Sequence, residues 1–192
     1  MLIQKNIDDF KMNLDIEDGG ISRTLYHHGG REKVFMSILK DTVQEGMTCL
    51  DLGGNIGYTT LPMLRNVGPE GFVYAVEPDS QSIGILTKNV EDNAYSDRCE
   101  ITQCAISGHD GIVEFWEASK PNLSSVKKNK YSTVKKQVPC FSLNTFLQDR
   151  RYPNFIKMDV EGHEVKIFEG GLDYFAKNEG HTNILLEVHP NT

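Results

Sequence analysis

Short runs of apolar residues alternate with amphipathic stretches along most of the chain. The runs of strand length are residues 47–52, 72–77, 99–106, 154–159 and 183–188. The stretches between them have helical spacing, and Asp79 is placed to cap one of these helices. Strands that alternate with helices predict an α/β fold with a mostly parallel, doubly wound sheet, covered by helices on both faces.

Three other segments complete the predicted arrangement. Residues 113–116 and 137–141 are expected to be short extra strands on either side of a loop. Residues 1–30 are polar and contain glycine pairs, so we expect an N-terminal arm followed by one functional domain over residues 31–192.

Two of the predicted helices have a definite apolar face. In the first, at residues 32–39, the face is formed by Val34, Phe35, Ile38 and Leu39. In the second, after residue 159, it is formed by Val165, Phe168, Leu172 and Phe175, although Gly170 and Gly171 weaken the middle of that helix.

The composition narrows the class of protein. The chain has 192 residues, which suits a single domain. Its net charge of −7 disfavours a general nucleic-acid binder or a protein bound to anionic membranes. The cysteines form no CxxC pair, the N-terminus lacks the apolar core of a signal peptide, and no apolar run reaches membrane-spanning length. We therefore expect a cytoplasmic protein with reduced thiols and no nucleic-acid or membrane partner.

The strongest local motif is Leu50-Asp-Leu-Gly-Gly-Asn-Ile-Gly57, which runs from a predicted strand into a predicted helix. Glycines here allow a tight turn and a close approach of a ligand to the backbone, and the helix that follows presents free N–H groups. The spacing Gly53-x-x-x-Gly57 differs from the GxGxxG of dinucleotide sites. A glycine turn alone is also compatible with a plain strand-to-helix connection.

Glu77 ends the next predicted strand, 24 residues after Gly53. A carboxylate at this place can accept hydrogen bonds from both ribose hydroxyls of a bound nucleoside. The alternative is a surface acid at a strand end. The combination with the glycine turn favours the nucleoside interpretation.

Acidic and histidine side chains gather after the last two predicted strands. Asp159, Glu161 and His163 follow one strand, and Glu187 and His189 follow the other. Surface capping is one interpretation of these residues. A metal site is another, but the spacing matches no closed site, so we expect no metal.

These segments together resemble the FkbM family of methyltransferases. The matching stretches are CLDLGGNIGYTT, VYAVEPD, AIS with VEFWE after it, FIKMDVEGHEVKIFEGG and ILLEVHP, in family order from about Glu32 to the end. The resemblance implies a Rossmann-like class I fold that binds S-adenosyl-L-methionine (SAM) and usually methylates a hydroxyl oxygen.

The resemblance also implies roles for particular residues. The turn residues Asp51, Gly53, Asn55 and Gly57, with Gly54 between them, would surround the methionine and ribose of SAM. Glu77 would hold the ribose, and Ala105 would lie near the adenine, although Gln103-Cys104-Ala105 does not identify which residue would make the polar or acidic adenine contact often found there. Such domains normally continue into a helix and a closing antiparallel strand pair, which this sequence lacks after Thr192. We therefore expect an open sheet edge through which copies of the chain could form a homo-oligomer.

The function expected from all of this is SAM-dependent O-methylation of a small molecule or sugar. In the class I strand order we expect the last two strands to lie beside the cofactor strand, so that their ends share one wall of the pocket. Asp159 and His189 would then form the base, with Glu187 beside them, and Glu161 with His163 would be the second choice. Two alternatives are an NAD-dependent oxidoreductase, disfavoured by the missing GxGxxG, and a non-catalytic module that binds SAM.

Overall fold

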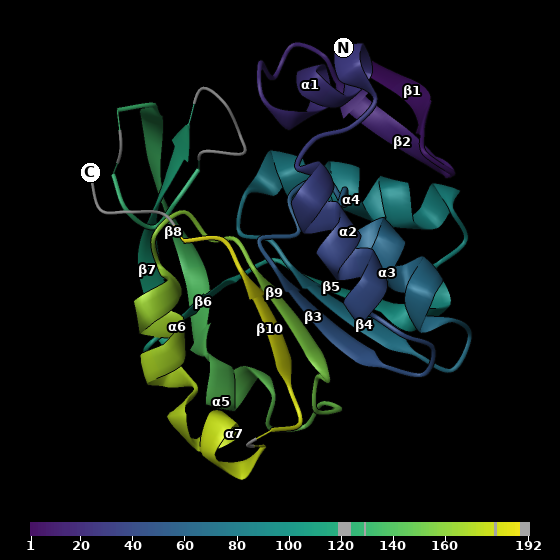
Figure 1. Cartoon of the computed structure of the whole chain (residues 1–192). Coiled ribbons are helices and arrows are strands. Elements are labelled where there is room, and N and C mark those ends of the chain that lie inside the picture. The colour runs from purple at the N-terminus through teal and green to yellow at the C-terminus, as the bar shows by residue number, and fades with distance from the viewer. Residues whose placement is uncertain (119–123, 129, 179, 189–192) are drawn as a thin grey trace.

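The computed structural model describes residues 1–118, 124–128, 130–178 and 180–188 (Figure 1). The central sheet is parallel and has the strand order β10-β9-β3-β4-β5. Its strands are β3 (Thr48–Leu52), β4 (Phe72–Val76), β5 (Cys99–Thr102), β9 (Phe155–Met158) and β10 (Asn183–Leu186). The chain starts the sheet at β3, adds strands on one side, and then returns to the other side of β3 with β9. This reversal between β3 and β9 is a topological switch point, where α/β sheets bind ligands.

Helices cover both faces of the central sheet, as the doubly wound prediction requires (Figure 1). One face carries α2 (Lys33–Thr42), α3 (Thr60–Val67) and α4 (Ser80–Asp92), and the other carries α5 (Leu143–Phe146), α6 (Glu164–Gly170) and α7 (Leu172–Lys177). Side chains along β3 alternate between the two sides, since Cys49 belongs to the first buried cluster whereas Leu50 and Leu52 belong to the second. The predicted α/β fold class is confirmed.

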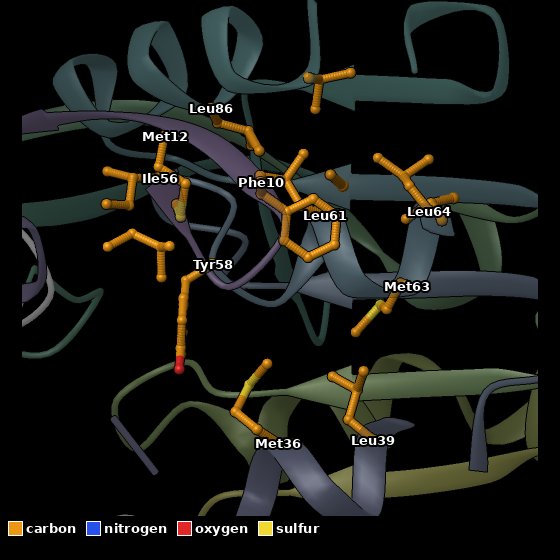
Figure 2. Close-up of a cluster of buried hydrophobic side chains, with 14 of the residues drawn as sticks. Phe10, Met12, Met36, Leu39, Ile56, Tyr58, Leu61, Met63, Leu64 and Leu86 are labelled. Carbon is orange, nitrogen blue, oxygen red and sulfur yellow. The ribbon is translucent and has the colours of Figure 1, made fainter. Parts of the chain in front are cut away.

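The first buried cluster joins the N-terminal segment to the sheet. Figure 2 shows Phe10 and Met12 of the N-terminal hairpin close to Leu61 of α3 and Leu86 of α4. The hairpin consists of β1 (Leu2–Ile7) and β2 (Phe10–Asp15), and α1 (Ile21–His28) follows it. The segment expected to be a polar arm is thus regular structure packed on α4, because Phe10, Met12 and Leu14 of β2 are buried. The proposed boundary at residue 30 stays a prediction.

A second sheet lies beside the central one and has the order β6-β8-β7. Its strands are β6 (Ala105–Ser107), β7 (Gly111–Ala118) and β8 (Ser132–Ser142), so the two predicted extra strands are confirmed but are longer than expected. The prediction of one strand over residues 99–106 is wrong. The chain turns at Gln103, where the N–H of Cys104 donates to the carbonyl of Thr102 at 3.2 Å, and β5 and β6 enter different sheets. The short 3₁₀ helix η1 (Ser96–Arg98) precedes β5.

The predicted apolar faces of two helices are partly wrong. In α2, Leu39 is buried as predicted, but Val34 and Ile38 are 75% and 45% exposed, and Met36 is buried in their place. The helix begins after Glu32, which has a left-handed backbone with φ 49°.

The helix predicted after residue 159 is divided into α6 and α7 at Gly171. Gly170 packs against the carbonyl of Ser107 so closely that a Cβ would lie 2.2 Å from that oxygen. The resulting bend buries Ile167 and Tyr174 and leaves Val165 and Leu172 on the surface.

The outer strand β10 forms one edge of the central sheet. Association of copies through this edge stays a prediction. Over the residues that the structure describes, no helix has both the length and the apolar character needed to cross a membrane.

Candidate functional site

A cavity of about 980 Å³, part of which is open to solvent, lies at the switch point. The turn after β3, the end of β4, the start of β6 and the segment after β9 line it, and residues around α1 and the start of α2 cover one side. Most of the predicted site residues line this cavity: Gly53, Gly54, Asn55, Glu77, Ala105, Asp159, Glu161 and Glu187. The topology therefore brings together side chains that lie more than 130 residues apart in the sequence.

The glycine turn is held by close contact with the neighbouring strands. The N–H groups of Gly53 and Gly54 both donate to the carbonyl of Val76, each at 3.0 Å. Gly53 has φ +80°, and a Cβ on it would lie 2.0 Å from the carbonyl oxygen of Asp159. Only glycine fits here, and the turn leaves a backbone cradle that opens into the cavity.

Glu77 fixes the other side of this cradle. Its side chain accepts the N–H of Asn55 and the N–H of Asp79, both at 2.8 Å. Each carboxylate oxygen has a second lone pair, so both can still accept a hydroxyl from a ligand. Burial raises the pKa of Glu77 to about 7, although the two backbone N–H groups oppose this rise. The cradle and this carboxylate fit a nucleoside-containing cofactor.

Asp51 and Gly57 are not among the residues that line the cavity. Asp51 is fully buried behind the turn, where one carboxylate oxygen accepts the hydroxyls of Thr59 and Thr60 at 2.9 and 2.7 Å. Gly57, with φ +91°, packs against Leu86 of α4. Both residues support the turn from behind, and direct contact of either one with a cofactor stays a prediction.

Lys157 is a feature that the motif analysis missed. It lies in β9, is 2% exposed, and lines the cavity. Its ammonium donates to the carbonyl of Gly53 at 2.7 Å and forms an ion pair with Asp51 at 3.2 Å. Burial favours a lower pKa for Lys157, but Asp51 and the other nearby carboxylates outweigh it and raise the pKa above its ordinary value. A lysine inside an otherwise apolar strand, Phe-Ile-Lys-Met, was the signal available in the sequence.

The opposite wall of the cavity is acidic. Asp159, Glu161 and Glu187 all line it. The N–H of Glu187 donates to the carbonyl of Met158 at 3.0 Å, which brings the end of β10 next to Asp159. The expectation that β10 also lies beside the cofactor strand is wrong, because β9 separates it from β3. His189 lies outside the described residues.

His163 adds a neutral imidazole to this wall. Its Nε2 lies 3.0 Å from the hydroxyl oxygen of the buried Ser107, at the end of β6. Burial, helped by the positive charge of Lys127, lowers the pKa of His163 to about 4. The histidine is therefore uncharged near neutral pH. Within the described ranges, no group of His, Cys, Asp or Glu side chains is arranged to hold a metal ion.

Comparison with known proteins identifies short stretches of high similarity. A protein-L-isoaspartate O-methyltransferase from Triticum aestivum is 39% identical over 59 residues, which is 31% of this chain and 26% of that protein. A tRNA wybutosine-synthesizing protein 2 homolog from Rattus norvegicus is 43% identical over 56 residues, covering 29% of this chain and 13% of that protein. The chain therefore spans about a quarter or less of the length of these relatives.

Among solved structures, the complex of aTrm5 with tRNALeu aligns with a TM-score of 0.50 at 14% identity, over 90% of this chain and 36% of that one. At this identity the likeness concerns the fold alone. The sequence profile described as the methyltransferase FkbM domain matches residues 51–192, which include the glycine turn, Glu77 and the acidic wall. This chain belongs to the FkbM methyltransferase family, whose cofactor is S-adenosyl-L-methionine.

Proposed function

We propose that this chain transfers the methyl group of SAM to a hydroxyl oxygen of a small molecule or sugar. The observation that carries the proposal is that one cavity joins the glycine turn and Glu77 to a wall of carboxylates. SAM supplies a methyl group that is already activated by its sulfonium. The protein then has to align the acceptor oxygen with that methyl group and accept the hydroxyl proton.

The cofactor side of the proposal assigns the turn Gly53-Gly54-Asn55 to the methionine and ribose of SAM, with Asp51 and Gly57 supporting the turn. Glu77 holds the ribose hydroxyls through the lone pairs that its two backbone hydrogen bonds leave available. Ala105 is 5% exposed and lies on the part of the cavity wall expected to meet the adenine.

The acceptor side assigns the base to the end of β9. Asp159 accepts the proton of the hydroxyl as the oxygen bonds to the methyl carbon, and His189 assists it. Glu187 and Glu161 orient the acceptor through hydrogen bonds. The contact between Glu187 and Met158 supports this assignment, because neighbouring strands lie about 4.8 Å apart.

The acceptor is proposed to be small rather than a nucleic acid. A phosphate backbone is bound through many lysine and arginine contacts, and the chain has a net charge of −7. The curated relatives include tRNA- and protein-directed enzymes by their names, so both classes of acceptor belong in the test.

The test is a screen with SAM labelled on its methyl group, offered sugars, phenols, aliphatic alcohols, tRNA and a peptide that contains isoaspartate. Label in an ether carbon of a small molecule, together with one equivalent of S-adenosylhomocysteine (SAH), would support the proposal. Label in tRNA or in the peptide would show that the acceptor is a nucleic acid or a protein and not a small molecule. Calorimetry with SAM and with NAD on the same sample would measure both affinities and so test the two alternatives, a non-catalytic SAM-binding module and an NAD-dependent oxidoreductase. Binding of SAM without transfer to any acceptor would favour a non-catalytic module, and preferential binding of NAD would reject the proposal.

A further inference from the structure

A buried positive charge lies in the wall of the cofactor cavity, and the proposed mechanism does not use it. Lys157 is 2% exposed, although burial of an ammonium is unfavourable without compensation. Its partner Asp51 is completely buried, so of this ion pair only the lysine lines the cavity.

The geometry fixes the position of this charge closely. The ammonium contacts Asp51 at 3.2 Å, the carbonyl of Gly53 at 2.7 Å and the carbonyl of Leu52 at 3.4 Å. The carbonyls belong to the end of β3 and the glycine turn, whereas Lys157 itself comes from β9. The charge is therefore held across the switch point, between the cradle and the acidic wall.

SAM and SAH, the product left after methyl transfer, differ by one unit of positive charge at the sulfur. SAM carries a sulfonium, and SAH carries a neutral thioether in the same molecule. A ligand that fills the cavity would lie near Lys157, because this residue is part of the wall. In a partly buried site the interaction between two such charges is only weakly screened.

We propose that Lys157 sets the preference of the cavity between SAM and SAH, by repelling the positive sulfonium and leaving the neutral thioether unaffected. Asp51 acts in the opposite sense, because its carboxylate attracts the sulfonium. The ion pair thus limits how tightly the charged substrate is held relative to the neutral product. The proposal rests on the assignment of the cavity to SAM, but not on the identity of the methyl acceptor.

The experiment is isothermal calorimetry of SAM, SAH and the amine analogue sinefungin at pH 8.5, where Glu77 is ionised. Lys157→Gln is expected to raise the ratio of SAH to SAM dissociation constants by on the order of tenfold, as one unit charge would do in such a site. Asp51→Asn is expected to lower the same ratio. Sinefungin is expected to follow SAM, because its amine carries the charge.

Controls separate this effect from damage to the fold. Lys157→Arg keeps the charge and is expected to keep the wild-type ratio. Lys88→Gln removes a lysine from α4 that is paired with Asp92 and does not line the cavity, and it is expected to change neither affinity. A general loss of structure would weaken all three ligands together and could not move the ratio in opposite directions in the two variants.

Equal losses of affinity for SAM and SAH in Lys157→Gln would overturn the proposal and leave Lys157 as a support for the turn. The same holds if both variants shift the ratio in one direction. If the wild-type protein binds neither SAM nor SAH, the proposed function fails as well, so the two failures are distinguishable.

Discussion

The two halves of the cavity are built in different ways. The cofactor half, formed by the ends of β3 and β4, is fixed by backbone hydrogen bonds from Gly53 and Gly54 to Val76 and by the contacts of Glu77. The acceptor half follows β9 and β10, and it consists of side chains on short segments, including Glu161 with a left-handed backbone at φ 53°. The first half is specified by the backbone, and the second by side chains. Binding and reacting groups carried by loops can change without a change of the fold, so we expect substitutions in the two halves to have different effects.

The largest expected effect comes from changing the acceptor half while leaving the cofactor half intact. Asp159→Asn and His189→Ala are each expected to reduce turnover by about 10²–10⁴-fold, because a positioned base typically contributes that much. The dissociation constant of SAH should change far less. Steady-state rates on an identified acceptor and calorimetry with SAH would measure the two quantities.

Glu169→Gln is the matched control, because Glu169 is an exposed acid on α6 that pairs with Lys166. Near-wild-type rates in both Asp159→Asn and His189→Ala would place the base elsewhere. His163, whose imidazole is uncharged near neutral pH, would then be examined next.

A second substitution tests the close contact between the two halves, where Gly53 packs against the carbonyl of Asp159. Gly53→Ala is expected to lower the free energy of unfolding by about 3 kcal/mol, since a non-glycine residue at φ +80° is strained and its Cβ would overlap the carbonyl of Asp159. Binding of SAM should be lost with it. Denaturant titration and calorimetry would measure these effects.

Gly84 provides the control for Gly53. It lies within α4, with nothing within 4 Å of the place where a Cβ would be. Gly84→Ala should raise the free energy of unfolding by about 0.5–1 kcal/mol, because alanine is the better helix former. A stable Gly53→Ala protein that binds SAM normally would show that the close approach of the two strands is not essential.

The sequence was sufficient to predict the strands and the turn that form the proposed cofactor half. Apolar runs located the strands of the central sheet, and the separation between Gly53 and Glu77 placed both at the ends of neighbouring strands. These signals are local, because a tight turn needs glycine and a buried parallel strand needs consecutive apolar residues.

Features that depend on distant parts of the chain were not predicted. The role of Lys157 requires knowing that β9 lies beside β3 with Asp51 opposite. The exposure of Val165 depends on how Gly170 packs against Ser107. The break after Thr102 depends on the separate sheet that β6 joins. None of these contacts leaves a periodic pattern in the sequence.

A third change tests whether the N-terminal hairpin supports the cofactor half. Asn89 of α4 is fully buried, accepts the N–H of Asn13 at 2.6 Å, and donates to the carbonyl of Ile56 in the cofactor turn at 2.7 Å. Asn89→Ala is expected to lower the free energy of unfolding by about 2 kcal/mol, because it leaves buried polar groups without partners. Affinity for SAH should fall as well.

Asn93 offers a matched comparison for Asn89. It also bonds to β2, through the backbone of Lys11, but its amide otherwise donates to the carbonyl of Asn89 within α4, and it lies nearer the surface. Asn93→Ala should reduce stability by a smaller amount and leave the affinity for SAH unchanged. Equal affinities in the two variants would mean that the hairpin acts only on stability.

The last expected effect, which is small near neutral pH, is a dependence of cofactor affinity on pH, and it arises within the cofactor half. Burial raises the pKa of Glu77 to about 7, above its ordinary value of 4.5. The ribose hydroxyls donate to the ionised carboxylate, so binding favours loss of the proton. Affinity for SAH is therefore expected to be full above pH 7 and to fall by up to about tenfold for each pH unit below it.

The same raised pKa has the opposite effect on the stability of the cofactor-free protein. The folded state holds the proton to a higher pH than the unfolded state, so the contribution of Glu77 to stability is present below pH 4.5 and is lost as the pH rises through about 7. Glu77→Gln removes the titrating group and should flatten both profiles, with weaker binding throughout. Calorimetry with SAH and thermal unfolding between pH 5 and pH 8.5, spanning the titration of Glu77, would test this. An affinity that stays constant in the wild-type protein over this range would show that Glu77 remains ionised, held by the N–H groups of Asn55 and Asp79 alone.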